Sequence, residues 1–168
     1  MALVEEQIGG APGRDETEHE RVDRNLTDLL GELRVALPGV QVLFAFLLTV
    51  PFQQRFQTAS SFEKYVYFGT LCCTAIASVL LIAPSAYHRV VFRLQDKPHI
   101  VEMANRFAVV GFAFLAAGMS GAILLVTHFL FSPAASVVAT TIAATLCMTL
   151  WYFLPVRRRL MLARQSRD

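Results

Sequence analysis

The chain has 168 residues, of which 55% are hydrophobic and only 17% are charged, and its mean hydropathy is +0.49. A soluble domain is normally about 45–50% apolar and about 25% charged, so this composition favours a membrane protein. No basic run of the sequence carries the interleaved aromatic side chains of a nucleic-acid module, so we do not expect a nucleic-acid partner.

Charged residues are absent from four long apolar stretches. These stretches are 35–52, 65–84, 107–131 and 134–154, with 18, 20, 25 and 21 residues. A helix needs about 20 apolar residues to cross about 30 Å of hydrocarbon. Because the stretches are apolar on all sides and do not alternate as barrel strands do, they predict helices. The predicted fold is an all-α integral membrane four-helix bundle, made of two transmembrane hairpins.

The residues before the first span divide into two parts. The acidic tail 1–23 contains Gly and Pro among dense charges, and we expect it to be disordered because it buries too little apolar surface. After it, leucines recur on one helical face, at Leu26, Leu29, Leu30 and Leu33. This spacing predicts a short amphipathic interfacial helix over 25–34, lying on the inner membrane surface. Pro38 should kink or break the helix, so that the in-plane segment turns into the first span.

The same patterns of charge and apolarity define the rest of the chain. The transmembrane domain is expected to cover 24–160, and 161–168 form a basic cytoplasmic tail. The segment 85–106 predicts two short helical pieces at the inner surface. The fourth span ends at Trp151 and Tyr152, which are typical aromatic anchors at a membrane interface.

The distribution of Lys and Arg predicts the orientation. Thirteen of the 15 basic residues lie in 1–34, 85–106 and 155–168, whereas the segment 53–64 holds only two. Cytoplasmic segments of membrane proteins carry the excess of Lys and Arg, so both termini are expected to be cytoplasmic. These basic surfaces suit anionic lipid headgroups. The alternative is that this face binds a protein partner or a second copy of the chain.

Small residues recur every fourth position in three spans, which favours close packing of helices in lipid. The rows are Gly69, Cys73 and Ala77; Ala113, Ala117 and Gly121; and Ala135, Ala139, Ala143 and Cys147. From these rows we expect Ala117 and Ala139 to lie in contacts between the third and fourth spans. A second group of polar span residues either lines a substrate path or packs, and the sequence leaves both open: Gln41, Thr49, Thr70, Thr74, Ser78 and Thr145.

No constellation of catalytic residues stands out, so we do not expect an enzyme. The four histidines show no metal-ligand spacing such as i, i+4 on one helix, and no pair predicts a haem site, so no cofactor or metal is expected. Only His128 is an ionisable group inside a span, near its outer end. Since ion pathways are normally marked by ionisable residues inside the membrane, this scarcity weighs against a transporter.

Several segments carry a family resemblance, and they are RNL at 24–26, ELRVALPGVQ at 32–41, FAFLL at 44–48, AP at 83–84, HR at 88–89, FR at 92–93 and WY at 151–152. Through them, residues 24–160 resemble a family of uncharacterised actinobacterial four-helix membrane proteins, a domain of unknown function. Some relatives carry an automatic sodium:proton antiporter label. The resemblance implies a multi-pass protein of the bacterial cytoplasmic (inner) membrane.

The resemblance also suggests that two segments at the inner membrane face matter together. The candidate functional residues in them are Glu32, Arg34, Pro38, Gln41, His88, Arg89 and Arg93. One hypothesis is that Glu32 pairs with Arg89 or Arg93. The function expected is that of a non-enzymatic structural, regulatory or interaction protein that acts through its basic cytoplasmic face. The alternative is a transporter or channel-like subunit of the cation/proton antiporter type.

Overall fold

The computed structural model describes residues 18–91 and 97–165, and within these ranges the chain is helical apart from short connections. The elements are α1 (Glu18–Thr49), the 3-10 helices η1 (Val50–Phe52) and η2 (Gln54–Thr58), α2 (Ser61–Val91), α3 (Lys97–Leu130), α4 (Pro133–Met148), the π-helix η3 (Thr149–Phe153) and α5 (Leu154–Gln165). The prediction of four helices long and apolar enough to cross a membrane is confirmed. Residues 1–17 of the tail predicted over 1–23, together with Arg93 and residues 166–168, lie outside the described residues. Residues 18–23 of that predicted tail belong to helix α1 instead.

Helix α1 packs through one stripe with a spacing of seven residues. The members of this stripe are Leu26, Leu33, Val40 and Leu47, with exposed fractions between 0% and 6%. Leu33 and Val40 join Ala77 and Leu81 of α2 and Ala108 and Leu115 of α3 in the hydrophobic core. Apolar residues repeated at this spacing keep one face of a helix turned toward its partners. Helix α1 therefore has the predicted leucine face, but this face packs against α2 and α3 and not against the membrane surface.

The separate interfacial helix expected over 25–34 is not formed. Helix α1 runs without interruption from Glu18 to Thr49, with Pro38 inside it. The stripe explains the difference, because Leu33 before the proline and Val40 after it pack into the same core. Packing on both sides of Pro38 stabilises a helix that the missing N–H alone would weaken. Helix α2 likewise continues to Val91 past Pro84, which is buried.

Close approach of α2 and α3 depends on glycines of α3 that face threonines of α2. A Cβ added at Gly118 would lie 2.6 Å from the Thr74 hydroxyl oxygen, and one at Gly121 would collide with Thr70. Gly121 and Ala77 belong to the predicted small rows. Gly69, Ala113 and Ala117 are exposed and Ala139 is half-buried, so only part of each row is buried or half-buried in the described structure.

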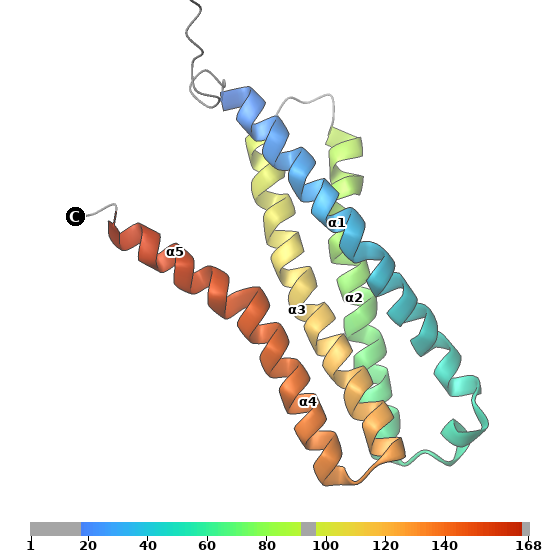
Figure 1. Cartoon of the computed structure of the whole chain (residues 1–168). Helices are drawn as coiled ribbons and strands as arrows, with labels where there is room; N and C mark the ends of the chain where they lie inside the picture. The colour runs from blue at the N-terminus through green and yellow to red at the C-terminus, as the bar shows by residue number, and fades with distance from the viewer. Residues whose placement is uncertain (1–17, 92–96, 166–168) are drawn as a thin grey trace, which may run out of the picture.

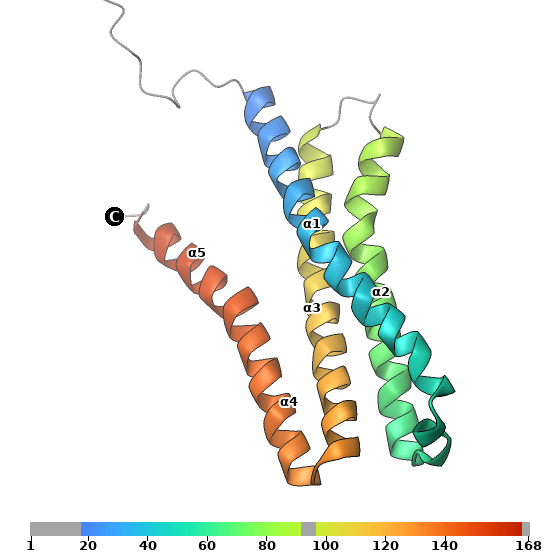
Figure 2. The ribbon, with the colours of Figure 1, turned by 45° about the vertical axis from the view of Figure 1, so that its right-hand side comes forward.

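The fourth long helix stands apart from the other three. Helices α1, α2 and α3 pack together, whereas α4 packs mainly on α3 and, in the described residues, buries only Ser136. Figures 1 and 2 show α4 and α5 forming one long helix that leans progressively away from α3. The predicted four-helix bundle is therefore a three-helix core with a fourth helix attached along one side.

The π-helix η3 attaches the leaning helix to α3. The Tyr152 hydroxyl donates a hydrogen bond of 2.7 Å to the Val109 carbonyl. The rings of Trp151 and Phe112 meet edge to face at 5.6 Å between centroids. Single π-helical turns inside α-helices often occur at functional sites. Beyond η3, α5 makes no substantial contact with another long helix in the described part of the chain.

Candidate functional site

The start of α1, the end of α2, the start of α3 and the end of α5 lie at the same end of the molecule (Figure 1). We call this the basic end, because it carries Arg89, Arg157, Arg158, Arg159 and Arg164, and we call the opposite end the loop end. The arrangement agrees with the topology expected from the Lys and Arg count.

The predicted site residues of α1 are all exposed. Arg34, Pro38 and Gln41 follow one another at i, i+4 and i+7, so they share one face of the helix, whereas Glu32 lies on another. None of the four lines a cavity among the pockets of the described residues. The structure therefore groups three of these residues on a surface, and it does not bring them into an enclosed site.

The second predicted segment lies at the end of α2. Arg89 is exposed, the side chain of His88 is not described, and Arg93 lies outside the described residues. Within the described chain, Glu32 and Arg89 form no ion pair. The hypothesis that Glu32 pairs with Arg93 stays a prediction.

The polar residues of the spans do not gather around one passage in the described structure. Thr70, Thr74 and Ser78 each donate to the carbonyl four residues earlier, over 2.7, 2.8 and 2.9 Å. Thr70 and Thr74 are buried against the glycines of α3. Gln41 and Thr49 are exposed on α1, and Thr145 is exposed on α4. The hydroxyls of α2 therefore satisfy their hydrogen bonds within the helix, and the burial of Thr70 and Thr74 against α3 favours the packing interpretation.

Helix α5 presents a concentrated positive charge. Its sequence LPVRRRLMLARQ has four arginines and no acidic residue, and all of its side chains are exposed. No ion pair to these arginines occurs in the described residues. Arginines and large apolar side chains alternate around the helix, which suits the boundary between hydrocarbon and headgroups, where long basic side chains extend toward water.

A groove opens at the basic end, where η3 and the start of α5 lean away from α3. It has a volume of about 490 Å³. Its walls are almost entirely apolar, with Val109 and Phe112 on α3, and Trp151 and Val156 on the other side. Arg159 is the one charged residue that lines it. The groove thus combines an apolar interior with a single cation, a pairing that suits a ligand with an apolar body and an anionic group.

Sequence reasoning identified Trp151, Tyr152 and the arginines, but it placed them in a membrane anchor and a tail. It missed the groove, because the predicted four-helix bundle contains no fourth helix that leans away from the others. No signal in a single sequence reports the lean of one helix from another. The π-helical turn at Thr149–Phe153 was also not anticipated.

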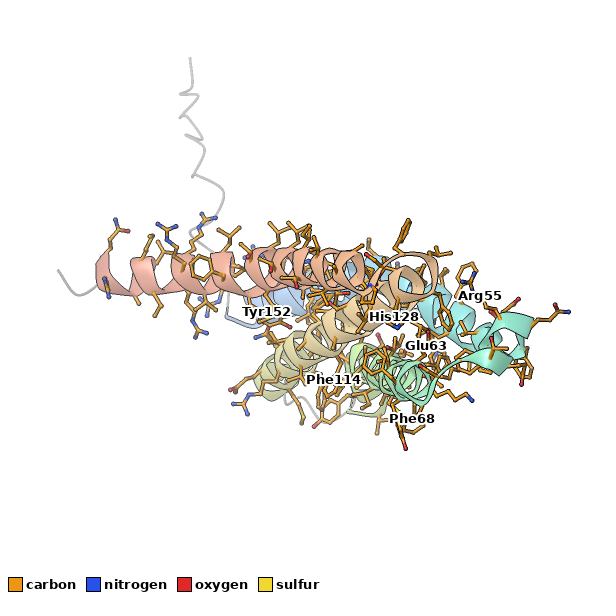
Figure 3. The ribbon with its side chains drawn as sticks, turned by 90° about the horizontal axis from the view of Figure 1, so that it is seen from below. Arg55, Glu63, Phe68, Phe114, His128 and Tyr152 are labelled. Carbon is orange, nitrogen blue, oxygen red and sulfur yellow. The ribbon has the colours of Figure 1, made fainter. Side chains whose placement is uncertain are left out.

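A second group of polar residues lies at the loop end (Figure 3). Arg55 donates a hydrogen bond of 2.6 Å to the Phe129 carbonyl, and its guanidinium lies 5.8 Å from the centre of the Phe129 ring. Glu63 approaches His128 at 3.9 Å. These contacts fasten the loop after α1 and the start of α2 to the end of α3.

The start of α2 is a capping box that sequence reasoning missed. The Glu63 carboxylate accepts a hydrogen bond of 2.6 Å from the Ser60 backbone N–H, and the Ser60 hydroxyl accepts one of 3.3 Å from the Glu63 N–H. The signal was the Ser-x-x-Glu spacing just before the apolar run. Glu63 therefore has a local structural role at the loop end.

The described residues contain no group of three or more His, Cys, Asp or Glu side chains able to hold a metal ion. No curated protein and no solved structure matches the chain. One family does match, over residues 15–155, which include the three packed helices, α4 and the groove as far as Pro155. The chain belongs to this family, the family of unknown function DUF6328.

Proposed function

We propose that this protein is a multi-pass membrane protein without catalytic activity, and that its basic end is a cytoplasmic surface that binds anionic lipid headgroups. Four helices of sufficient length and apolarity support the membrane location. The excess of Lys and Arg at the basic end supports a cytoplasmic position for that end.

The observation that carries this proposal is the exposed, acid-free helix α5 with its four arginines. Each Lys or Arg near an anionic membrane surface contributes about 1 kcal/mol to the attraction. Four of them on one short helix, without acidic partners in the described chain, therefore provide a substantial and salt-sensitive affinity.

The length of the helix that includes α4 and α5 supports a position of its arginines among the lipid headgroups. The continuous helix Pro133–Gln165 has 33 residues. At 1.5 Å per residue it is about 50 Å long, which exceeds the hydrocarbon thickness of about 30 Å. A helix that begins at the loop-end boundary reaches the opposite boundary near Tyr152, after about 29 Å. Arg157 and the residues after it then lie among the headgroups.

The test is the thermal unfolding of the purified protein in a neutral detergent with added phosphatidylglycerol or phosphatidylcholine. Phosphatidylglycerol should raise the unfolding temperature more, because a ligand that binds the folded state stabilises it. High salt should remove the difference. A variant with glutamine at Arg157, Arg158, Arg159 and Arg164 should lose it at low salt too. Lys64→Gln, a charge removal at the loop end, is the matched control and should keep it. Equal stabilisation by the two lipids in the unaltered protein contradicts the proposal.

A further inference from the structure

We infer that the groove between α3 and the η3–α5 segment is a binding site for one anionic phospholipid, whose acyl chain lies against Phe112 and Trp151 and whose phosphate binds Arg159. This inference rests on the proposed function and makes it specific. The proposed function requires only a general attraction to charged headgroups, whereas the groove selects one lipid molecule at one place.

Shape is the first argument. The groove volume of about 490 Å³ falls within the range of about 300–1,000 Å³ that is typical of small-molecule sites. Two contacts join the walls of the groove, since Tyr152 is hydrogen-bonded to the Val109 carbonyl and the Phe112 and Trp151 rings are in contact. These contacts fix the position of one wall relative to the other. The groove is therefore a preformed hollow rather than a loose gap between helices.

Chemical complementarity is the second argument. The walls are formed by the apolar side chains of Val109, Phe112, Leu150 and Val156. Such walls suit an acyl chain, whereas a small soluble anion could contact only Arg159. Arg159 supplies a guanidinium, which binds phosphate oxygens in a planar, two-pronged manner. Its charge has no acidic partner in the described chain.

Depth is the third argument. At 1.5 Å per residue, Trp151 and Tyr152 lie about one hydrocarbon thickness from the start of α4. Tryptophan and tyrosine concentrate at this boundary because one part of each side chain is apolar and the other polar. Arg159 follows Trp151 by two helical turns, or about 12 Å, on the headgroup side. The apolar walls on the hydrocarbon side and Arg159 on the headgroup side therefore match the acyl chain and the phosphate of a phospholipid.

The chain contains a built-in probe of this site, because Trp151 is its only tryptophan. The experiment uses the full chain in phosphatidylcholine nanodiscs that contain a small fraction of phosphatidylglycerol. Either lipid is supplied in a form with brominated acyl chains, and quenching of the Trp151 fluorescence reports which lipid occupies the groove. We expect brominated phosphatidylglycerol to quench more than brominated phosphatidylcholine at equal mole fraction.

Three variants make the result specific. Arg159→Gln should reduce the preference for phosphatidylglycerol about five-fold, which corresponds to about 1 kcal/mol for one arginine near the surface. Arg158→Gln removes the same charge one residue away, outside the groove lining. It should weaken the general attraction to anionic lipid but reduce the quenching preference clearly less than Arg159→Gln does. Val109→Phe should fill the groove and reduce quenching by both lipids. Arg159 is exposed, so its replacement should leave folding intact.

Two outcomes overturn the inference and leave the proposed function standing. Equal losses in Arg158→Gln and Arg159→Gln mean a diffuse attraction to the surface. Weak quenching by both lipids, together with a dimeric native mass, means that a second copy covers the groove. A third outcome, no phosphatidylglycerol preference in the unaltered protein in quenching or in thermal unfolding, removes both the site and the proposed function.

Discussion

Gly118 of α3 lies directly against Thr74 of α2, so closely that a methyl group at position 118 would come within 2.6 Å of the threonine hydroxyl oxygen. That hydroxyl is held by a hydrogen bond of 2.8 Å to the Thr70 carbonyl. The contact fixes the distance between the two helices that share the most extensive interface in the described molecule.

Gly118→Ala should therefore destabilise the protein by about 1–3 kcal/mol, the usual cost of inserting a methyl group into a packed core. Gly69→Ala is the matched control, because a Cβ at Gly69 meets nothing within 4 Å. Alanine favours helix over glycine by about 0.8–1.0 kcal/mol, so the control should be neutral or stabilising. Thermal unfolding in detergent measures both. The same sign and size for the two variants would show that the α2–α3 contact is looser than described.

Tyr152→Phe should weaken the attachment of the leaning helix to α3. The substitution removes the hydrogen bond to the Val109 carbonyl, which is worth about 0.5–1.5 kcal/mol. Emission of the neighbouring Trp151 should change as its contact with Phe112 loosens. Tyr65→Phe, at a tyrosine with an exposed fraction of 77%, should change neither the stability nor the emission. Unaltered emission in Tyr152→Phe would mean that the ring contact alone positions η3.

The two roles of Glu63 can be separated by a pair of substitutions. Its bond of 2.6 Å to the Ser60 N–H is far shorter than its approach of 3.9 Å to His128, so the capping box should dominate. Glu63→Gln keeps a capping-box acceptor and should retain most of the stability. Glu63→Ala should lose about 1 kcal/mol, as removal of a helix cap does. If Gln were as damaging as Ala in thermal unfolding, the charge facing His128 would be the larger contribution.

Membrane orientation is open to direct test with reporter fusions. A reporter placed after Gln57, in the loop between α1 and α2, should lie outside the cell. A reporter placed after Arg164, in α5, should lie in the cytoplasm, because basic segments remain there. A cytoplasmic signal at Gln57 would contradict the proposed topology, and an external signal at Arg164 would place the basic end on the wrong side for anionic inner-leaflet lipids.

Sodium:proton exchange should be absent from liposomes that contain the purified protein. Exchange requires a group that ionises within the membrane and is reached from both sides in turn. The apolar stretches hold no Asp or Glu, and Thr70 and Thr74 pack against glycines instead of lining a passage. A pH-sensitive dye should therefore respond to a sodium gradient no more than in empty vesicles. Robust exchange that survives His128→Ala would favour the transporter alternative, with Glu32 as the first carboxylate to replace.

The sequence alone predicts the number of long helices, because charged residues are absent from four stretches and a membrane-length helix needs about 20 apolar residues. It also identified the leucine face of α1, the aromatic pair at 151–152 and the arginines after it. These features depend on the kind of residue at each position along one helix, which is what a sequence reports directly.

The tertiary structure decided which faces meet. Inside a bilayer, lipid tails are as apolar as leucine, so hydrophobicity does not select the packed side of a span. Close fit selects it, and this fit placed Gly118 and Gly121 against α2 while Ala113 and Ala117 stayed exposed. The same packing keeps α1 helical across Pro38, because Leu33 and Val40 belong to one hydrophobic core. The groove beside Arg159 exists because α4 packs on α3 near the loop end, whereas α5, which follows η3, leans away from α3. This relation between helices is not encoded in any single segment.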